Sequence, residues 1–457
     1  MKRSFQKGNH LWAIESVGKR VTTTWGVVGR KPQSKSAAHG SINAALWELH
    51  AQARLKLRAG YAETTFRGDL PLAHPTAEGL IEALTENPDD LAAHMAFADW
   101  LSEQADDRLT AWGEFMRLQL AQEQTPPVGK RKTPDMRRIE ELRGDFEMHW
   151  LGEKLAIPLL GLGTEDLRNR SRYAHDTQTR RYVRGWLDSL TMFGLDKELA
   201  RAMAGSKALR LLRTLEISEL EGDYEDGSLA VLAKSTVLAN VRHLRFIAYG
   251  PDSGLTSLIR SMPQLKSLRL AVDGLEPGSL FAMPSLASLH TLEVIGPVRF
   301  QLEKLAANPA MGHLRRLALN MAADSDDIFD EPEEYLSDDE IHAICYAPYL
   351  TGLKELALHW VETTDDDAWR PFAESGILAR LDLLDLTRSN LHDRSVEILA
   401  ASPDFARIPR VILDENYLEP LTVRRLRQIN KGVEAHDQRD DFDEYDDIDN
   451  DFDDDWE

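Results

Sequence analysis

An apolar triplet with the spacing Leu-x-x-Leu-x-Leu recurs along residues 187–418 and constrains the fold more than any other feature of the chain. Its nine copies begin at Leu187, Leu212, Val241, Leu265, Leu289, Leu314, Leu353, Leu381 and Ile408, so the steps between them are 25, 29, 24, 24, 25, 39, 28 and 27 residues. A repeat of this length is typical of a solenoid, in which each unit buries its apolar side only against its neighbours. We therefore expect a stack of strand–helix units over this region.

The triplet is similar to the strand signature of leucine-rich repeats, and that resemblance implies an α/β solenoid of about nine repeats. A helical stretch follows most triplets, for example at residues 197–203, 228–232 and 394–400. The family's asparagine, three positions past the triplet, appears only as Asn416, with Asp273 and Ser389 as polar substitutes. We therefore expect an irregular array in which the asparagine ladder is mostly missing.

The central residues of the triplets are candidates for binding a protein partner. Side chains alternate along a strand, so these positions face away from the apolar core and onto the predicted concave surface. The predicted partner-binding residues are Glu216, Arg245, Arg269, Glu293, His359 and Asp385. One interpretation is that Arg245 and Arg269 pair with the neighbouring glutamates across the strands. The other is a mixed-charge face for a partner, to which His243 and Trp360 add contact area.

The first 70 residues predict two short strands joined at Gly18-Lys19, one alternating through Leu11 and Ala13, followed by a helix that ends near Gly60. The segment resembles a WGR domain, a small sheet-plus-helix module. The resemblance covers about residues 4–66 and is carried by Trp12-x-Ile14-Glu15, Thr22-Thr23-Thr24-Trp25-Gly26, Gly29, Lys35 and the ending Lys56, Gly60, Tyr61.

In poly(ADP-ribose) polymerases such a domain helps to bind DNA breaks, so the resemblance implies contact with DNA or RNA. The motif arginine is replaced here by Val27. The candidate nucleic-acid-binding residues are Trp25, Arg30, Lys31 and Lys35, the cations acting through sequence-independent phosphate contacts. The alternative is that Trp25 packs within its own sheet and the cations form a solvated rim.

Residues 76–125 predict a short helical module, and residues 126–186 a basic linker followed by a cap on the array. The strings Asn87-Pro88-Asp89-Asp90, Phe97-Ala98-Asp99-Trp100-Leu101 and Gly113–Gln119 resemble the repeat-companion domain found beside leucine-rich repeats in planctomycete and myxobacterial proteins. No activity is assigned to that family. The spacing of Leu91, Met95, Phe97 and Leu101 predicts an amphipathic helix whose apolar residues are buried.

The sequence contains few residues or motifs that indicate catalysis, nucleotide binding or metal binding. The sequence has no P-loop, dinucleotide fingerprint, His-Glu-x-x-His or Gly-x-Ser-x-Gly motif. Asp99, Glu114 and Arg117 permit an enzymatic hypothesis, but acidic residues on amphipathic helices usually form structural pairs. The single cysteine, Cys345, excludes an internal disulfide and a cysteine-built zinc site, and we predict that it is a core thiol. We expect no catalytic residues, no metal and no cofactor.

The ends of the chain carry opposite charge. Residues 1–68 hold twelve Lys or Arg against three Glu, and residues 434–457 hold fourteen Asp or Glu against one Arg. Phe442, Tyr445, Phe452 and Trp456 are spaced through the acidic tail, which predicts a disordered segment that docks on a basic surface in cis or in trans. Residues 324–334 are predicted to form a second acidic segment, a solvated loop.

These features predict a multidomain α/β protein with boundaries at 1–70, 76–125, 126–186, 187–433 and 434–457. No apolar run is long enough for a membrane-spanning helix, and the N-terminus lacks a secretory h-region. One cysteine fits a reducing, cytoplasmic compartment. We expect a non-enzymatic scaffold that binds an unknown protein through the array. The alternative is a nucleic-acid-responsive regulator in which the tail competes for the N-terminal domain.

Overall fold

The computed structural model describes residues 2–40, 42–65, 70–126, 132–160, 179–218, 227–249, 254–273, 277–296, 300–320, 336–361 and 363–439. The fold is mixed α/β, with a small antiparallel sheet and a long mixed sheet. The chain divides into two compact units, one made of residues 1–218 and 225–241 and the other of residues 219–224 and 242–457.

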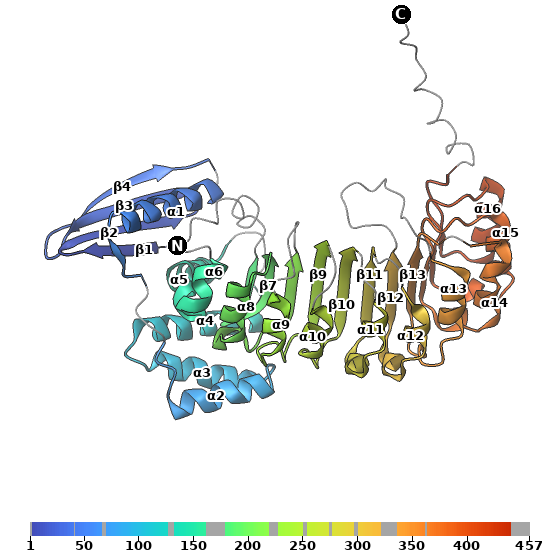
Figure 1. Cartoon of the computed structure of the whole chain (residues 1–457), viewed down its shortest axis with the longest axis horizontal. Coiled ribbons are helices and arrows are strands. Elements are labelled where there is room, and N and C mark those ends of the chain that lie inside the picture. The colour runs from blue at the N-terminus through green and yellow to red at the C-terminus, as the bar shows by residue number, and fades with distance from the viewer. Residues whose placement is uncertain are drawn as a thin grey trace, which may run out of the picture. The chain divides into compact units, whose positions relative to one another are not determined.

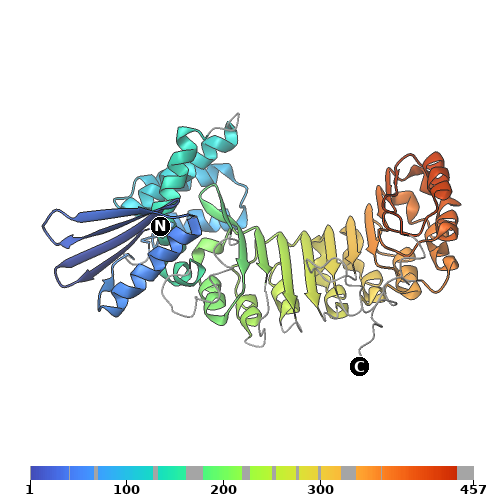
Figure 2. The ribbon, with the colours of Figure 1, turned by 90° about the horizontal axis from the view of Figure 1, so that it is seen from above.

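The N-terminal sheet has the strand order β4-β3-β2-β1-β5 and carries one helix. Its elements are β1 (Lys2–Lys7), β2 (His10–Val17), β3 (Arg20–Val27), β4 (Gln33–Ala38), α1 (Ile42–Arg58) and β5 (Ala62–Glu63). Figure 2 shows α1 running along this sheet. The core between helix and sheet consists of Phe5, Trp12, Ile14, Val21, Ala45, Leu49 and Ala53. We call residues 2–65 the N-terminal domain.

The sequence prediction for this domain was wrong in two respects. Two strands were predicted, whereas β1 and β4 add two more long ones, and every residue of β4 is exposed. The alternation in β2 also has the opposite phase, because Trp12 and Ile14 are buried and Leu11 is exposed. Sequence alone misses β4 because a strand with no buried face shows no hydrophobic period.

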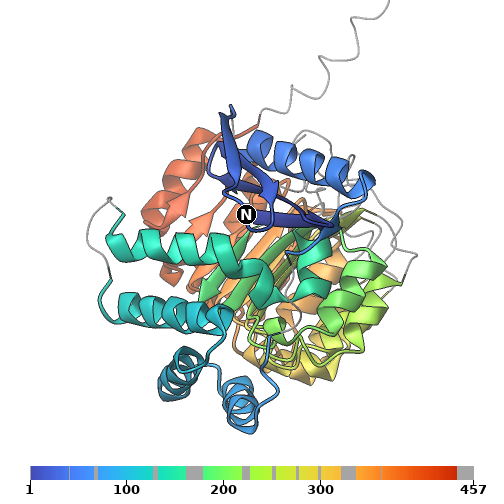
Figure 3. The same ribbon diagram turned by 90° about the vertical axis from the view of Figure 1, so that its left-hand side faces the viewer.

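A helical module follows, made of α2 (Pro75–Glu86), α3 (Leu91–Ser102), α4 (Asp107–Gln124), α5 (Pro134–Leu151) and α6 (Glu153–Leu159). Asp90 caps α3 by accepting a hydrogen bond from Ala93 N, and Asp106 caps α4 in the same way through Arg108 N. The sequence favours Thr76 as the cap of α2, but the cap is His74, whose Nδ1 accepts a hydrogen bond from Thr76 N. Figure 3 shows α4 and α5, in cyan and teal, lying side by side.

Helix α4 also packs against a hairpin of the long sheet and forms hydrogen bonds with its turn. The hairpin joins β6 (Arg180–Val183) to β7 (Trp186–Phe193) through Arg184 and Gly185, which both have positive φ, as a two-residue hairpin turn requires. Trp112 of α4 donates to Gly185 O at 2.8 Å, and Gln119 accepts from Gly185 N at 2.7 Å. Trp112 and Trp186 pack edge to face, with ring centroids 5.1 Å apart. The predicted linker and cap region therefore contributes to one aromatic core with the module.

The sequence places a cluster of arginines just before the array, and those that the structure describes take part in this packing; the cluster comprises Arg168, Arg170, Arg172, Arg180, Arg181 and Arg184. Arg180, whose side chain is 16% exposed, donates to Glu147 at 2.8 Å, and Arg184 bonds Glu123 at 2.5 Å. Arg168, Arg170 and Arg172 lie outside the described residues.

The long sheet has the strand order β16-β15-β14-β13-β12-β11-β10-β9-β8-β7-β6. The first unit contains β6, β7 and β8 (Thr214–Ser218), with α8 (Lys197–Ala204) and α9 (Ser228–Ala233). The strands of the second unit are β9 (His243–Tyr249), β10 (Ser267–Asp273), β11 (Thr291–Ile295), β12 (Arg316–Asn320), β13 (Glu355–His359), β14 (Leu383–Asp385), β15 (Arg410–Ile412) and β16 (Val433–Glu434). They are mutually parallel.

Helices follow the strands of the second unit. They are α10 (Leu255–Arg260), α11 (Gly278–Phe281), α12 (Leu302–Ala306), α13 (Asp338–Cys345), α14 (Arg370–Glu374), α15 (Asp393–Ala400) and α16 (Pro420–Ile429), with short 3₁₀ turns between several helices and the next strand. Figure 1 shows β9 to β13 side by side, with α10, α11 and α12 along one side of them.

The nine predicted triplets coincide with the nine strands β7 to β15. Within the second unit, the middle apolar residue of a triplet pairs with its counterpart in the next strand, as in Leu244↔Leu268 and Leu268↔Leu292, and the ladder continues through Leu317, Leu356, Leu384 and Val411. All of these side chains are buried. The predicted helical stretches at 197–203, 228–232 and 394–400 are confirmed to within two residues as α8, α9 and α15, and the stretches 255–259, 301–305 and 339–345, which the same pattern predicts, are confirmed equally closely as α10, α12 and α13.

Buried asparagines form hydrogen bonds between successive repeats. Asn416 accepts from Ser389 N and Leu391 N and donates to Leu386 O, as its predicted ladder position requires. Ser389, the predicted substitute, donates to Leu358 O at 2.8 Å. Sequence reasoning missed Asn240, Asn308 and Asn430, each of which donates to backbone carbonyls about one repeat earlier in the chain. They stand just before strands rather than after them, so the family position does not find them.

Two features of the C-terminal part differ from the sequence prediction. Trp360 was expected to add exposed contact area, but it is buried, with the guanidinium groups of Arg388 and Arg439 at 5.2 and 5.3 Å from its ring centroid. Residues 433–439, where the predicted tail begins, pair with the sheet or bond to it, as Glu434 does with Arg410 at 2.8 Å. The remainder of the tail and the predicted acidic loop at 324–334 lie outside the described residues.

Candidate functional sites

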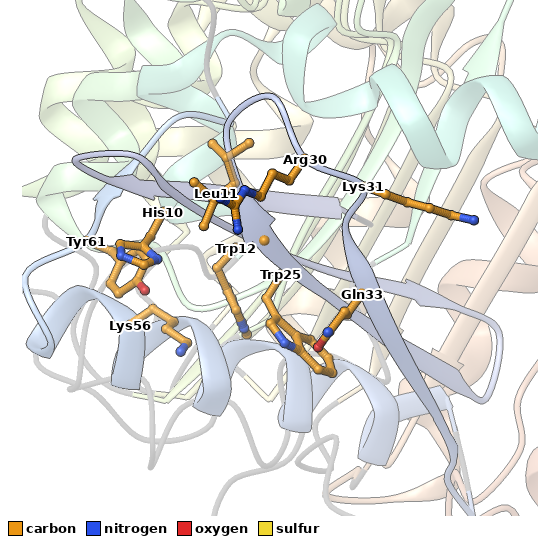
Figure 4. Close-up of a pocket in the computed structure, with 11 residues that line it drawn as sticks. His10, Leu11, Trp12, Trp25, Arg30, Lys31, Gln33, Lys56 and Tyr61 are labelled. Atoms are coloured by element: carbon orange, nitrogen blue, oxygen red, sulfur yellow. The ribbon is translucent and has the colours of Figure 1, made fainter.

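A pocket of about 510 Å³ opens at one end of the N-terminal sheet. It is lined by His10, Leu11, Trp12, Trp25, Gly26, Val27, Arg30, Lys31, Gln33, Lys56 and Tyr61, which come from β2, β3, the β3–β4 turn, β4 and the end of α1. Figure 4 shows that Trp12, Trp25 and Lys56 project toward the same space, whereas Lys31 extends away from the other labelled side chains. The lining thus combines aromatic faces with cations.

The strand register places the two tryptophans together. Trp12 of β2 is paired with Trp25 of β3, which in turn is paired with Gln33 of β4. Trp12 belongs to the domain core, whereas Trp25 is 37% exposed and lies outside that core. An aromatic ring left open to solvent beside a pocket is available for stacking with a planar ligand.

The β3–β4 turn places Arg30 and Lys31 at the edge of the pocket. Arg30 N donates to Val27 O at 3.0 Å, and Gly29 adopts a φ of +81° that favours glycine. A Cβ at Gly26 would lie 3.2 Å from Pro32 Cα, so the motif glycine lets the returning chain approach β3 closely. The turn leaves Arg30 and Lys31 exposed.

The end of α1 supplies the opposite wall. Tyr61 N donates to Lys56 O and Gly60 N donates to Leu57 O, with Gly60 at φ +81°, which is the Schellman arrangement for ending a helix. The Lys56 ammonium lies 5.2 Å from the ring centroids of both Trp12 and Tyr61. The Lys56–Gly60–Tyr61 pattern seen in the sequence therefore ends the helix and places one cation between two aromatic faces.

Of the four predicted nucleic-acid residues, the structure brings Trp25, Arg30 and Lys31 together at the pocket and places Lys35 on β4 outside the lining. Sequence reasoning missed His10, Gln33, Lys56 and Tyr61 as lining residues. The charge of the basic N-terminal segment is also partly used internally, since Arg3 is buried and forms a two-pronged ion pair with Glu63. Val27, at the motif arginine position, lines the pocket without a charge.

The second candidate surface is the polar side of the long sheet. In the second unit, Arg245 pairs in register with Arg269, and Arg269 with Glu293, whose carboxylate lies 3.6 Å from the Arg269 guanidinium. The predicted Arg269–Glu293 ion pair is thus confirmed. Glu216 belongs to the first unit, where it accepts a hydrogen bond from Thr191 at 3.1 Å.

The same side of the sheet carries a second polar pair farther along. His359 Nε2 lies 3.2 Å from Asp385 Oδ1, and Asp385 also accepts from Thr387 N at 3.1 Å. Burial of Asp385 raises its pKa, but the bonds from His359 and Thr387 outweigh burial and leave the pKa below its usual range. The central positions between Glu293 and Asp385 are the small residues Ala318 and Ala357.

The three residues of the enzymatic hypothesis have separate surroundings. Glu114 accepts two hydrogen bonds from Arg138, at 2.7 and 2.9 Å, which lower the pKa of its carboxyl group. Arg117 donates to the Ser102 hydroxyl. Asp99 is exposed on α3. For Glu114 these contacts favour the structural interpretation, as a surface ion pair between α4 and α5.

Cys345 is buried, as predicted for a core thiol, and burial raises the pKa of its thiol group. No group of three or more His, Cys, Asp or Glu side chains within the described ranges is arranged to hold a metal ion. Among the described helices, none is both long enough and apolar enough to cross a membrane.

Comparisons with known proteins add no functional information. No protein-family model and no curated protein matches the sequence. Among solved structures, the chain is similar to a structural genomics target from Bacteroides fragilis at 14% sequence identity and a TM-score of 0.36, over 96% of this chain and 97% of the other. This likeness is too low to support an argument about fold or function.

Proposed function

We propose that the chain is a non-enzymatic interaction protein, a leucine-rich-repeat array that binds a protein partner through the polar side of its long sheet. The strand–helix repeat and the buried asparagines support the assignment to leucine-rich repeats. The face comprises Arg245, Arg269, Glu293, His359 and Asp385 of the second unit, and Glu216 is a separate candidate in the first unit.

One observation carries the proposal. Arg245 and Arg269 occupy directly opposite positions on neighbouring strands, where like charges destabilise a sheet. A protein that keeps this juxtaposition on an accessible face gains from it when an acidic group of a partner binds between the two guanidinium groups.

Comparative capture from an extract of the source cells tests the proposal. The full chain, the charge-reversed variant Arg245→Glu/Arg269→Glu and the control Arg424→Glu are used as baits. Arg424 is exposed on α16 and therefore controls for reversing the charge of a surface arginine outside the face. A protein retained by the wild type and by the control but absent from the double variant is the expected result. Equal capture by all three baits excludes the face as the binding surface.

The pocket of the N-terminal domain supports a second function, contact with nucleic acid by a WGR-like domain. Trp25 is available to stack on an exposed base, and Arg30 and Lys31 stand where they can contact phosphates. Lys56, between Trp12 and Tyr61, adds positive charge at the pocket wall. Because Val27 stands at the motif arginine position, the phosphate contacts would come from Arg30 and Lys31 in the β3–β4 turn.

Salt-dependent fluorescence anisotropy with a labelled DNA duplex bearing a single-stranded end tests this function. Trp25→Ala is expected to weaken binding by about 1–3 kcal/mol, as for loss of one stacked base. Arg30→Gln/Lys31→Gln is expected to reduce the salt slope by about 2, one for each phosphate group that the variant no longer neutralises. The control Lys19→Gln/Arg20→Gln removes two exposed cations at the opposite end of β2 and β3. If it weakens binding equally, the attraction is non-specific and the pocket is not the site.

The acidic tail is proposed to compete for this basic domain. Truncation after Arg439 retains the residues that bond to the sheet. It is expected to raise DNA affinity at low salt and to have little effect at high salt, where charge competition is screened. Equal affinity with and without the tail at every salt concentration contradicts the competition.

A further inference from the structure

Helix α3 is apolar around most of its circumference, yet only one side of it is buried. His94, Phe97, Ala98 and Leu101 face the core. On the other side, Leu91 is 44% and Met95 51% exposed, and Ala92 and Ala96 are exposed beside them. The sequence predicted Leu91 and Met95 to be buried, and that prediction was wrong. A helix that is apolar all round is normally buried all round, so no element among the described residues covers this exposed side.

The exposed residues form a continuous ridge. Leu91 and Met95 are four residues apart, as are Ala92 and Ala96, so each pair lies on adjacent turns of the same helix face. We call these four residues the α3 ridge. Alanine beside the larger side chains lets another helix approach closely, and methionine adapts to irregular partners. Contiguous exposed apolar surface of this kind marks interaction sites in folded proteins.

The two helices that carry the ridge and its neighbours, α2 and α3, contain acidic residues but no Lys or Arg, although Arg184 and Arg213 bond the Pro88–Asp89 turn between them and Arg117 bonds Ser102. Residues 75–103 contain seven acidic residues and no Lys or Arg. Glu78, Glu82 and Glu86 are exposed along α2 at intervals of four, and Asp99 and Glu103 continue the Leu91–Met95 spacing along α3. Across the described part of the chain, none of these five carboxylates has an ion-pair partner, although Asp89 nearby in sequence bonds Arg213 at 2.7 Å.

This distribution is costly for the isolated helices. Like charges at i and i+4 destabilise a helix by about 0.2–0.5 kcal/mol per pair, and neither α2 nor α3 contains a compensating cation. A partner that is apolar on one side and basic beside it would bury the apolar ridge. The same partner would also pair with the acidic residues.

We propose that α2 and the α3 ridge form a docking surface for a cationic amphipathic helix of a protein partner. Apolar side chains of that helix pack on Leu91 and Met95, and its Lys and Arg residues face Asp99, Glu103 and the α2 carboxylates. A second copy of the chain is a poorer occupant, because self-association brings acidic surfaces together. This site is separate from the sheet face and from the N-terminal pocket, so it extends the proposed function to a further partner.

The test uses the full chain and a fluorescein-labelled 18-residue peptide of leucine and lysine whose spacing segregates them on opposite helix faces. A peptide of the same composition without that segregation is the ligand control. Leu91→Gln/Met95→Gln removes the apolar ridge, and Leu421→Gln/Ile429→Gln is the matched control, since those residues are 66% and 46% exposed on α16. Anisotropy at 0.15 M salt measures affinity, hydrogen exchange locates the peptide, and sedimentation reports self-association.

The expected result is at least tenfold weaker binding for the ridge variant, a change of less than twofold for the control variant, and exchange protection in residues 75–103. The chain's formal charge of −22 attracts any cationic peptide. The test therefore depends on the difference between the ridge variant and the control variant, and between the segregated and the unsegregated peptide. Equal binding by both variants, equal binding of the unsegregated peptide, or protection confined to residues 440–457 overturns the proposal. Self-association that disappears in the ridge variant also overturns it, because the occupant is then a second copy.

Discussion

At the scale of single residues, the role of each side chain at the N-terminal pocket could be predicted from the sequence only in part. Trp12 and Trp25 are the same residue type on paired strands, yet one is in the core and the other opens onto the pocket. The sequence could predict that Trp25 matters, because it lies in a recognisable motif. It could not predict Tyr61 as a pocket wall, since that requires knowing how the Gly60 turn redirects the chain.

His94 couples the stability of the helical module to pH. It is buried on α3, with Nε2 donating to Pro88 O at 3.1 Å, and Nδ1 has no hydrogen-bond partner in the described structure. Burial lowers the pKa of His94, and Arg184 and Arg213 lower it further, while the Pro88 bond and Glu123 act in the opposite direction. The folded protein therefore keeps the imidazole neutral at a pH where the unfolded chain is protonated.

The sign of the pH effect follows from this shift. Stability is fully present above the unfolded-state pKa of 6.5 and falls as the pH drops below it, by at most about 1.4 kcal/mol per pH unit. We predict that His94→Gln, which retains a donor for Pro88 O, loses less stability than the wild type between pH 7.5 and pH 5. Urea unfolding at the two pH values measures this, and equal losses contradict the role given to His94.

At the scale of elements, periodic segments were predictable and non-periodic ones were not. The strands β7 to β15 could be placed because one buried apolar pattern recurs through them. Strand β4 was missed because all of its side chains are exposed, and the buried side of α3 was misassigned because both of its sides are apolar. Hydrophobic period reports burial only when the opposite face is polar.

The buried asparagines give a test of the repeat at this scale. Asn416→Ala leaves Ser389 N and Leu391 N without their acceptor, and each unsatisfied buried group costs about 1–3 kcal/mol. We predict a loss of about 2–5 kcal/mol in the free energy of unfolding of the second unit. Gln428→Ala removes an exposed amide from α16 and is expected to change stability by less than about 0.5 kcal/mol. Hydrogen exchange in β14 and β15 measures both, and a neutral Asn416→Ala would exclude a structural role for this side chain.

At the scale of the whole molecule, the proposed binding surfaces differ in character. The N-terminal pocket is aromatic and basic, the α3 ridge is apolar with acidic surroundings, and the sheet face carries mixed charge. The order of these parts could be predicted from the sequence, because each has its own pattern. Which partner binds to each could not, since a repeat pattern specifies how strands stack and not which polar side chains are used.

The most direct test of the proposed sheet-face function is the affinity of a partner identified by capture for the purified full chain, measured by titration calorimetry. Arg245→Glu/Arg269→Glu is predicted to raise Kd at least tenfold, about 1.4 kcal/mol, while Arg424→Glu leaves it within twofold. Circular dichroism should be unchanged in both variants, because a surface ion pair such as Arg269–Glu293 contributes at most about 1 kcal/mol. A partner that binds the charge-reversed face as tightly as the wild type contradicts the proposed function.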